Sequence, residues 1–313
     1  MKSKLIFVTG GLGFIGKHFV KRCLDMGHFV TNVDMVNYAA DRFANEAFKL
    51  HSNYRHLEED IANLGHLPEC DFLVNFAAES HVDNSIADNR QFCHSNIIGV
   101  QRLLELTRAK SSAGAPHFIQ ISTDEVYGDV ADGRHTESDL LRPSNPYSAT
   151  KAAADMLVIG WARTYGLLYN IVRMTNNYGP NQYPEKLIPK SAWRIRRGLL
   201  ALMHGDGSYI RSWLHVEDSI DAILTIIEKG KPNTIYNVHG NCELQNIEVL
   251  RKIASIIGVP EKDAYTPIPN RVGQDVRYSL DDTRIRALGW KPMRDFDEEL
   301  KKIVMEDDFK RFL

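Results

Sequence analysis

Short apolar runs alternate with amphipathic segments along the first half of the chain. Residues 4–10 (KLIFVTG) form a β-rich run, and residues 14–27 (FIGKHFVKRCLDMG) carry apolar side chains at helical spacing. Residues 29–34 (FVTNVD) are again typical of an extended strand. This order predicts a βαβ unit at the start of the chain.

The alternation continues beyond this first unit. Residues 72–78 (FLVNFAA) and 117–123 (HFIQIST) are further predicted strands, and a helical stretch from about 90 to 109 separates them. Consecutive strands joined by helices favour a parallel sheet with helices on both faces. We therefore expect an α/β fold built on a doubly wound parallel sheet.

The pattern changes after about Pro180, where prolines and glycines recur and shorter elements alternate with loops. We place a domain boundary there, between a first domain, 1–180, and a smaller C-terminal α/β lobe, 181–313. Within the second part, a helical pattern is followed by the apolar run TIYNVHG. This run could rejoin the first sheet, so we expect residues 213–240 to pack back onto the first domain.

Composition narrows the class of protein. Hydrophobic residues make up 43% of the 313 residues and charged residues 25%, as in soluble globular proteins. The formal net charge of −2, without a basic block, argues against a nucleic-acid partner. No apolar segment approaches the roughly 20 residues that a membrane span needs, and the first strand lacks signal-peptide features. We expect a cytoplasmic protein with no membrane partner.

The cysteines do not suggest a metal site or disulfide bonds. They are scattered without CxxC spacing, in a chain large enough to fold without cross-links. The four are Cys23, Cys70, Cys93 and Cys242. We expect reduced packing residues, and we expect no bound metal.

A glycine-rich turn, TGGLGFIG, lies between the first predicted strand and helix. Gly10, Gly13 and Gly16 would let the backbone approach a pyrophosphate at the positive end of the helix. A tight strand-to-helix connection also favours glycine, so the turn alone leaves two interpretations open. The residues that follow favour the nucleotide.

Asp34 ends the second predicted strand about 20 residues after the turn, where a carboxylate accepts hydrogen bonds from the adenosine ribose. Its neighbours Met35 and Val36 offer no arginine for a 2′-phosphate, which favours NAD over NADP. A helix cap is the alternative role for Asp34. For Asp60 two interpretations stay open: a contact with the adenine or a position in a solvated turn. Together these features predict an NAD-binding Rossmann fold.

A second cluster of chemical groups begins where the strand 117–123 ends. In ISTDEVYG the hydroxyl of Thr123 is followed by two adjacent carboxylates, Asp124 and Glu125. An isolated pair of this kind is usually a solvated turn, and both acids reach one pocket only if the chain bends there. In NPYSATK, Tyr147 and Lys151 are four residues apart and lie on one face of a helix, where an ammonium group can lower the pKa of a phenol. With the nucleotide turn, these residues form a coherent acid–base set.

The chain resembles the extended short-chain dehydrogenase/reductase family, which shares the glycine turn, the strand-end Ser/Thr and the Tyr-x-x-x-Lys pair. Within it, six ordered blocks are similar to the sugar-nucleotide 4,6-dehydratases, most closely the dTDP-glucose 4,6-dehydratases. The blocks are ISTDEVYG, AAESHVDNSI, NPYSATKAAAD, NNYGPNQYPEKLIP, WLHVED and RVGQDVRYSLD. The resemblance covers nearly the whole chain. It implies a Rossmann domain with retained NAD, a smaller lobe that binds the nucleotide sugar, and a homodimer.

The resemblance also implies a division of chemical roles. Tyr147, as a phenolate, takes the proton of the hexose C4 hydroxyl, with Lys151 lowering its pKa and Thr123 hydrogen-bonded at the same oxygen. Glu125 is the base at C5, and protonated Asp124 delivers a proton to the departing C6 oxygen. Like charges held close cannot both ionise cheaply, so the two carboxyl groups are expected to differ in protonation.

Further contacts with cofactor and substrate follow from the same resemblance. The cofactor residues lie in the glycine turn, at strand ends and on the catalytic helix: Gly10, Gly13, Phe14, Ile15, Gly16, Asp34, Asp60, Ile61, Ala77, Ala78, Tyr147 and Lys151. The substrate residues lie mostly in the second half: Ser80, Asn176, Lys186, Leu187, Leu202, His204, Arg211, Asn237, Arg271 and Tyr278. The two arginines are expected to clamp phosphates, whose oxygens suit guanidinium groups.

Two departures leave the substrate open. Where the dTDP-glucose enzymes hold thymine between a proline and an aromatic residue, this chain has Leu202 and His204 in LALMHGDG. The usual acidic-Arg-Pro-Gly-His run is replaced by NRVGQD. UDP- or GDP-linked hexoses, including N-acetylated ones, are therefore alternatives to dTDP-glucose. A C4 epimerase or decarboxylase of the same fold is a second alternative, against which the Asp-Glu pair argues, and an inactive NAD-sensing scaffold is a third.

Overall fold

A seven-stranded parallel sheet forms the centre of the protein in the computed structural model, which describes residues 3–110 and 114–306. In spatial order the strands are β10 (Thr234–Val238), β6 (Tyr169–Met174), β5 (His117–Thr123), β4 (Phe72–Asn75), β1 (Leu5–Thr9), β2 (Phe29–Asp34) and β3 (Tyr54–Glu58). Every neighbouring pair is parallel. The doubly wound parallel sheet expected from the alternating pattern is confirmed.

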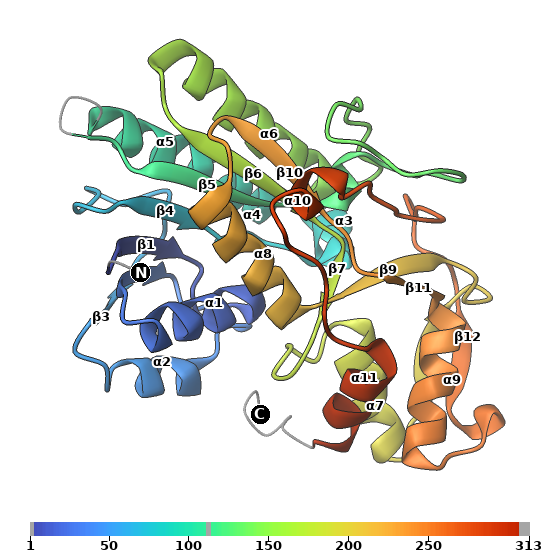
Figure 1. Ribbon diagram of the computed structural model, residues 1–313. Coiled ribbons are helices and arrows are strands. Elements are labelled where there is room, and N and C mark those ends of the chain that lie inside the picture. The colour runs from blue at the N-terminus through green and yellow to red at the C-terminus, as the bar shows by residue number, and fades with distance from the viewer. Residues whose placement is uncertain (1–2, 111–113, 307–313) are drawn as a thin grey trace.

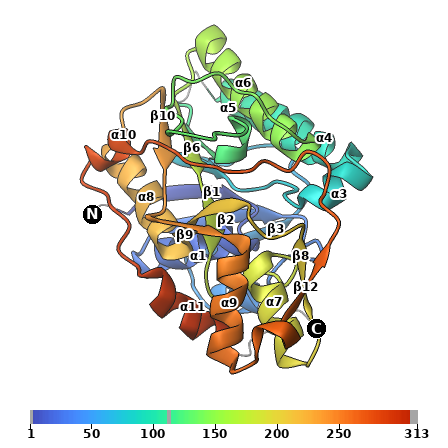
Figure 2. The same cartoon turned by 90° about the vertical axis from the view of Figure 1, so that its right-hand side faces the viewer.

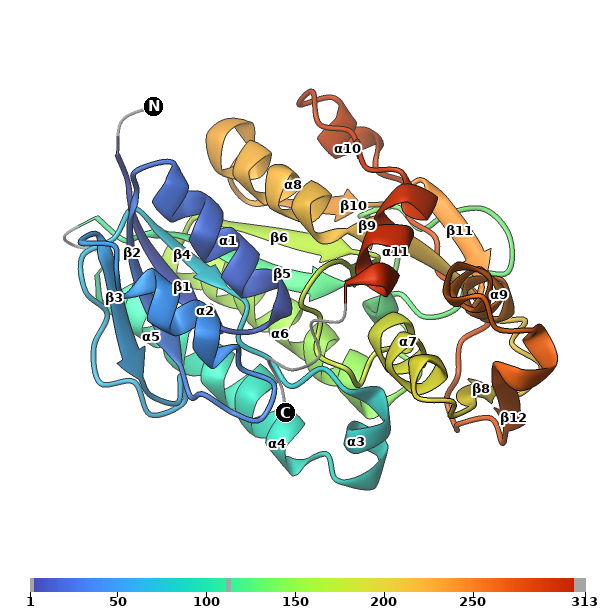
Figure 3. The ribbon, with the colours of Figure 1, turned by 90° about the horizontal axis from the view of Figure 1, so that it is seen from below.

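Helices cover both faces of this sheet, as Figure 3 shows from below. One face carries α1 (Phe14–Asp25), α2 (Arg42–Phe48) and α8 (Val216–Lys229), and the other carries α5 (Val100–Ala109) and α6 (Pro146–Tyr165). Alternate residues of a strand point to opposite faces, so Ile6 and Val8 pack with α1 while Phe7 packs with α5 and α6. Strands buried on both faces explain the continuous apolar runs in the sequence.

The predicted helix from 90 to 109 is not continuous. It begins as α4 (Arg90–Cys93), widens into a π-helical turn, η1 (His94–Gly99), and continues as α5. Asn96 in the wide turn is buried, and its amide group bonds to the backbone of Glu79 and to the Thr150 hydroxyl. A π turn of this kind often accompanies a functional site.

The remaining elements gather around a separate apolar cluster, seen in Figures 1 and 2 beside the carboxyl ends of the large sheet. The three helices are α7 (Leu187–Arg196), α9 (Asn246–Ile257) and α11 (Phe296–Met305). The strands are β7 (Asn176–Tyr178), β9 (Ile210–His215) and β11 (Cys242–Gln245) in one small sheet, and β8 (Ala201–His204) with β12 (Tyr265–Ile268) in another. Short elements complete the fold: α3 (Val82–Ala87), η3 (Asp124–Val126), η4 (Glu261–Asp263) and α10 (Thr283–Arg286).

The chain returns to the large sheet after β9. Helix α8 packs on the same face as α1, and β10 pairs with β6, with Tyr236 opposite Val172. The two parts of the molecule are therefore connected by more than one crossing of the chain. Across the described residues, no helix combines the length and apolar character that a bilayer crossing requires.

Candidate active site

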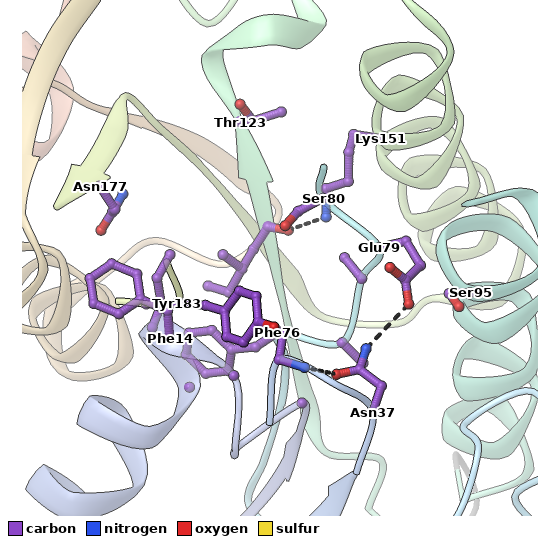
Figure 4. Close-up of a pocket in the computed structure, with 18 of the residues that line it drawn as sticks. Phe14, Asn37, Phe76, Glu79, Ser80, Ser95, Thr123, Lys151, Asn177 and Tyr183 are labelled. Atoms are coloured by element: carbon purple, nitrogen blue, oxygen red, sulfur yellow. Dashed lines mark hydrogen bonds between the residues drawn. The ribbon is translucent and has the colours of Figure 1, made fainter. Parts of the chain in front are cut away.

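A cavity of about 320 Å³ lies at the carboxyl ends of β1, β2, β4, β5 and β6. Ligands of open parallel sheets bind at this edge. Five segments that are far apart in the sequence line the cavity: 10–16, 33–40, 59–61, 76–80 and 121–125. Residues of α6 and of the segment from 174 to 186 also contribute to the lining. Figure 4 shows the rings of Phe14, Phe76 and Tyr183 on one side of the cavity, and Glu79 and Ser95 on the other.

The glycine turn leaves no room for a Cβ atom at Gly10 or Gly16. Gly10 has φ of +67°, and a Cβ there would lie 2.6 Å from the Ala77 backbone nitrogen. A Cβ on Gly16 would overlap the carbonyl oxygen of Gly10. Helix α1 begins directly after Gly13, so its first N–H groups point toward this bare backbone. This arrangement fits the pyrophosphate of a dinucleotide.

Asp34 is buried at the end of β2, beside the turn. Its carboxylate accepts hydrogen bonds from the backbone N–H groups of Leu12 and Val36, at 2.9 and 2.8 Å. Burial raises the pKa of Asp34, and the two N–H groups partly oppose that rise. Val36 has φ of +54°, an unfavourable conformation for a β-branched residue, which marks this loop as strained. Asp34 is thus held rigidly where a ribose would lie.

Asp60 also lines the cavity. One of its oxygens accepts a hydrogen bond from the Ala62 N–H at 2.9 Å, and the other lies 2.8 Å from His94 Nε2. His94 belongs to the π turn, which brings it to this position. The remaining predicted cofactor residues, Phe14, Ile15, Ile61, Ala77 and Ala78, line the same cavity.

The chain bends immediately after β5, and this bend lets two carboxyl groups that are adjacent in the sequence face the same cavity. Strand β5 ends at Thr123, and Asp124 opens the 3₁₀ helix η3. The Thr123 hydroxyl caps that helix, accepting a hydrogen bond from the Glu125 N–H at 3.3 Å and donating one to Asp124 Oδ1 at 3.1 Å. Both carboxyl groups therefore line one cavity.

The two carboxyl groups have different surroundings. Burial, followed by the nearby Glu125 carboxylate, raises the pKa of Asp124 to about 8. Burial also raises the pKa of Glu125, but the positive charges of Arg211 and Lys186 oppose this rise. Asp124 therefore keeps its proton at neutral pH, while nearby cations favour the charged form of Glu125.

Tyr147 and Lys151 lie in the first turns of α6. The helix begins with a capping box of Asn145 and Ser148, with Pro146 at its first position. Tyr147 is buried, and it lines the cavity together with Thr123. Helix α6 is thus fixed at the end that faces the cavity.

The expected effect of Lys151 on Tyr147 is absent from this structure. Burial, with the carboxylates of Glu125 and Asp124, raises the pKa of Tyr147. Burial lowers the pKa of Lys151 to about 8, and its ammonium group donates to the Ile121 carbonyl at 2.7 Å. Desolvation, which disfavours the charged form of both groups, is the largest cause of each pKa shift.

A buried ion pair lies next to Lys151. Asp155, one turn further along α6, pairs with Arg173 of β6 at 2.9 Å, and both side chains are at most 1% exposed. Arg173 also donates to the Tyr127 hydroxyl at 2.7 Å. Asp155 raises the pKa of Lys151 and so partly offsets the effect of burial.

The predicted substrate residues fall into two groups. Ser80, Asn176 and Lys186 line the cavity, and Lys186 Nζ donates to the Ser80 carbonyl at 3.1 Å. The others are outside the lining: Leu187, Leu202, His204, Arg211, Asn237, Arg271 and Tyr278.

Several residues of the second group still bear on the site. The Arg211 guanidinium stacks on Tyr278, with 4.5 Å between its Cζ atom and the ring centroid, and its charge acts on both carboxylates. Arg271 lies 3.3 Å from Asp83, and its buried Nε has no hydrogen-bond partner. An unpaired guanidinium N–H of this kind suits an anionic ligand.

The structure places Asn237 and His204 away from the cavity lining. Asn237 is fully buried in β10, where it accepts from the Tyr127 hydroxyl at 2.9 Å and donates to the His135 carbonyl at 3.1 Å. His204 Nδ1 lies 3.0 Å from the Pro269 carbonyl. Leu202 is two residues before His204 on β8, so the two side chains share one face of that strand.

The cavity is also lined by residues that the sequence did not single out, among them Asn37, Glu79 and Tyr183. The Asn37 amide donates to the Glu79 carboxylate at 3.3 Å, and the Tyr183 ring packs edge-on against Tyr38. Glu79 and Tyr183 lie inside blocks that resemble the dehydratases. They could therefore have been recognised from the sequence as polar or aromatic residues at a predicted strand end or loop.

A glycine turn for a dinucleotide, a Tyr-Lys pair and two bent-in carboxyl groups together define an enzyme of the short-chain dehydrogenase/reductase class that acts on sugar nucleotides. Comparison with known sequences places the chain more closely. It belongs to the family described as GDP-mannose 4,6 dehydratase, whose sequence model matches residues 7–303.

Known relatives extend over nearly the whole chain. A low-salt glycan biosynthesis protein, Agl12, of Haloferax volcanii is 42% identical over 96% of this chain and 97% of that protein. A dTDP-glucose 4,6-dehydratase of Haemophilus influenzae is 38% identical over 96% of each. The crystal structure of DesIV, a dTDP-glucose 4,6-dehydratase of Streptomyces venezuelae with NAD bound, has a TM-score of 0.91 and 37% identity, covering 96% of this chain and 95% of that one. The predicted fold and family resemblance are confirmed.

Proposed function

We propose that this protein is a sugar-nucleotide 4,6-dehydratase that converts an NDP-hexose of the gluco series into its 4-keto-6-deoxy derivative. The adjacent Asp124 and Glu125 carry this proposal, because both line one cavity, where burial and Glu125 raise the pKa of Asp124 while Arg211 and Lys186 oppose the rise in the pKa of Glu125. Elimination of water needs an acid for the leaving oxygen and a base for the C5 proton. A C4 epimerase has no such elimination to catalyse.

NAD fits the glycine turn and Asp34, and when bound it supplies a temporary acceptor for the hydride of C4, which is returned to C6. The protein side chains handle the protons. We assign Tyr147 to the proton of the C4 hydroxyl and Glu125 to the proton of C5, which a ketone at C4 makes more acidic. Protonated Asp124 donates to the C6 oxygen as it leaves. Lys151 has donors beyond the one bonded to Ile121, which suits a ribose hydroxyl.

The nucleotide is proposed to bind against the second lobe. We retain residues 1–180 as the NAD-binding part and residues 181–313 as the nucleotide-sugar-binding part, with 213–240 packed onto the first. Arg211, Arg271 and Lys186 are the cations available for the diphosphate. Their arrangement supports this role, since the charges of all three act on Glu125 and so lie on the side of the cavity where the two carboxyl groups stand.

We propose dTDP-glucose as the first substrate to test, with UDP- and GDP-linked hexoses as alternatives. A leucine and a histidine share the face of β8 where a base would stack, and this surface has no strong preference among bases. The purified enzyme should be mixed separately with dTDP-glucose, UDP-glucose, UDP-N-acetylglucosamine, GDP-mannose and GDP-N-acetylglucosamine. A product lighter by one water identifies the donor. An epimer of unchanged mass, or no product from any donor, refutes the proposal.

The role of the carboxyl pair is tested by Glu125→Gln. An amide keeps the shape of the side chain but cannot accept the C5 proton. We expect NADH absorbance to appear on mixing with substrate, without a 4-keto-6-deoxy product. Asp263→Asn, an exposed acid in η4, is the matched control and should dehydrate at the wild-type rate. Wild-type exchange of solvent deuterium into C5 by the Glu125→Gln variant would remove Glu125 from this role.

A further inference from the structure

Three short segments meet at the cavity, and each contributes residues to its lining. They are residues 36–41, which come after β2, residues 79–80, which come after β4, and residues 181–186, which precede α7. The first and the third begin at non-glycine residues with positive φ, Val36 at +54° and Asn181 at +60°. Such backbone is found where a segment clamps a ligand and its surroundings hold it in place.

Two hydrogen bonds attach the outer segments to the central one. The Asn37 amide donates to the Glu79 carboxylate at 3.3 Å, as Figure 4 shows, and Lys186 Nζ donates to the Ser80 carbonyl at 3.1 Å. The central segment is itself held in place, because the Asn96 amide group bonds to both the N–H and the carbonyl of Glu79. It is therefore a fixed anchor for the other two.

The two outer segments also contact each other directly. The Tyr38 hydroxyl donates to Glu185 Oε2 at 3.1 Å, and the Tyr38 ring packs edge-on against Tyr183, with 5.3 Å between the ring centroids. We call these two interactions the closing contact. Tyr38 is 54% exposed and is not one of the lining residues, so the closing contact lies on the solvent side of the cavity. It completes a ring of three linked segments at the cavity.

A second tie between the outer segments is buried. Lys17 Nζ donates to Asp41 Oδ2 at 2.9 Å and to the Asn181 carbonyl at 2.6 Å. Lys17 and Asp41 are 6% and 1% exposed. Charge-assisted hydrogen bonds of this kind are about twice as strong as neutral ones. The closing contact is thus the weaker of the two ties and the one that opens first.

We propose that the closing contact is a gate that keeps NAD in the site between turnovers. The glycine turn and Asp34, which fit NAD, line the same cavity as the two outer segments. A dinucleotide bound there is released when residues 36–41 and 181–186 part. Because its side chain is outside the lining, Tyr38 is a positioning residue that holds one segment against the other. Retention serves the proposed dehydration, in which the hydride taken from C4 must return to C6 of the same sugar.

Removing the closing contact should speed the exchange of bound NAD. The holoenzyme is mixed with excess NAD deuterated on the nicotinamide ring, and the mass of the nucleotide extracted from the protein is followed over time. Tyr38→Phe removes one hydrogen bond, so exchange should be about 2–10-fold faster than in wild type. Tyr38→Ala also removes the ring contact, so exchange should be about 10–100-fold faster. A variant that loses NAD during purification is reloaded before the measurement.

Tyr265→Phe is the matched control. The Tyr265 hydroxyl donates to Glu261 Oε2 at 2.8 Å, an exposed bond of the same kind outside the cavity lining. Exchange in this variant should equal that of wild type, and wild-type exchange in Tyr38→Ala, or equal acceleration in Tyr265→Phe, would overturn the gate. The double variant Tyr38→Phe with Glu185→Ala should exchange no faster than the faster of its single variants, because both remove one bond. Effects that multiply would show that this bond is not the link.

The affinity for NAD separates a gate from a direct contact with the nucleotide. The closing contact joins protein groups alone, so its loss should speed entry and release alike and leave the dissociation constant unchanged. Equilibrium dialysis of the holoenzyme against graded concentrations of NAD measures this constant. A dissociation constant that rises as much as the exchange rate would make Tyr38 part of the binding surface and overturn the gate. Neither measurement uses a sugar nucleotide, so a failure of the proposed dehydratase would be seen separately, as absence of water loss.

Discussion

Replacing Asp124 by asparagine should make the stability of the protein less sensitive to pH. Burial raises the pKa of Asp124 from 3.8 to about 8 in the folded protein, and its side chain is only 3% exposed. The folded state therefore keeps a proton that the unfolded state releases. A raised pKa of this kind lowers stability progressively as pH rises from about 4 to about 8.

The size of the effect follows from this pKa difference. One pKa unit corresponds to about 1.4 kcal/mol, so at pH 7 the cost of keeping Asp124 in its buried site is about 4 kcal/mol relative to pH 4. Asparagine removes this dependence and still accepts the Thr123 hydrogen bond. Its amide nitrogen would lack a partner, as Oδ2 does, at a cost of about 1–3 kcal/mol. That cost is the same at every pH. The informative quantity is therefore the slope of the unfolding free energy against pH.

Urea unfolding followed by tryptophan fluorescence at pH 5, 6, 7 and 8 measures this slope. The difference in unfolding free energy between Asp124→Asn and wild type should shift in favour of the variant by about 1.4 kcal/mol per pH unit. The exposed Asp263→Asn serves as the control and should follow wild type. NAD content must be equal in all samples, because a bound ligand adds stability. Parallel curves for Asp124→Asn and wild type would refute the assigned protonation state.

Three further changes test other parts of the structure. Arg173→Met should lower the unfolding free energy in urea by about 3–5 kcal/mol, because Asp155 would be left buried without its ion-pair partner; a loss below 1 kcal/mol would contradict this. Gly16→Ala should abolish retention of NAD through purification, because its Cβ would overlap the Gly10 carbonyl; an unchanged ratio of nucleotide to protein absorbance would contradict it. Met156→Glu, on the exposed side of α6, should convert the proposed homodimer to monomers in sedimentation, and a wild-type monomer at micromolar concentration would refute the dimer itself.

The sequence was sufficient to predict five strands of the seven-stranded sheet, although not β3 or β6, and to mark the end of β5 as a place where functional groups gather. Strands buried on both faces leave continuous apolar runs, and the end of each run locates an edge where ligands bind. Thr123, Asp124 and Glu125 follow such a run directly, so their shared pocket required only one bend in the chain. At these positions the sequence pattern of a strand followed by polar residues matched the local structure, a strand that ends in a short 3₁₀ helix.

Features that depend on tertiary packing were not predictable in this way. The π turn at 94–99 interrupts a helix whose apolar spacing looked regular. The raised pKa of Tyr147 arises from burial by several distant segments, which spacing on one helix does not report. Asn237 matched a motif for substrate contact, but β10 carries it into the sheet, where it bonds to Tyr127. In each case the structural feature depends on contacts with residues that are far away in the sequence.

The pairing of β10 with β6 has a consequence for how the chain is made. During synthesis, β6 is complete well before β10, and the residues from 175 to 233 must be added in between. At the usual rate of translation this takes about 3–12 s. Throughout that interval the open edge of β6 offers unpaired backbone groups beside apolar Ile171 and Val172, a surface on which nascent chains can associate. The yield of active enzyme on overexpression should therefore depend on chaperones that cover this edge while the ribosome completes β10.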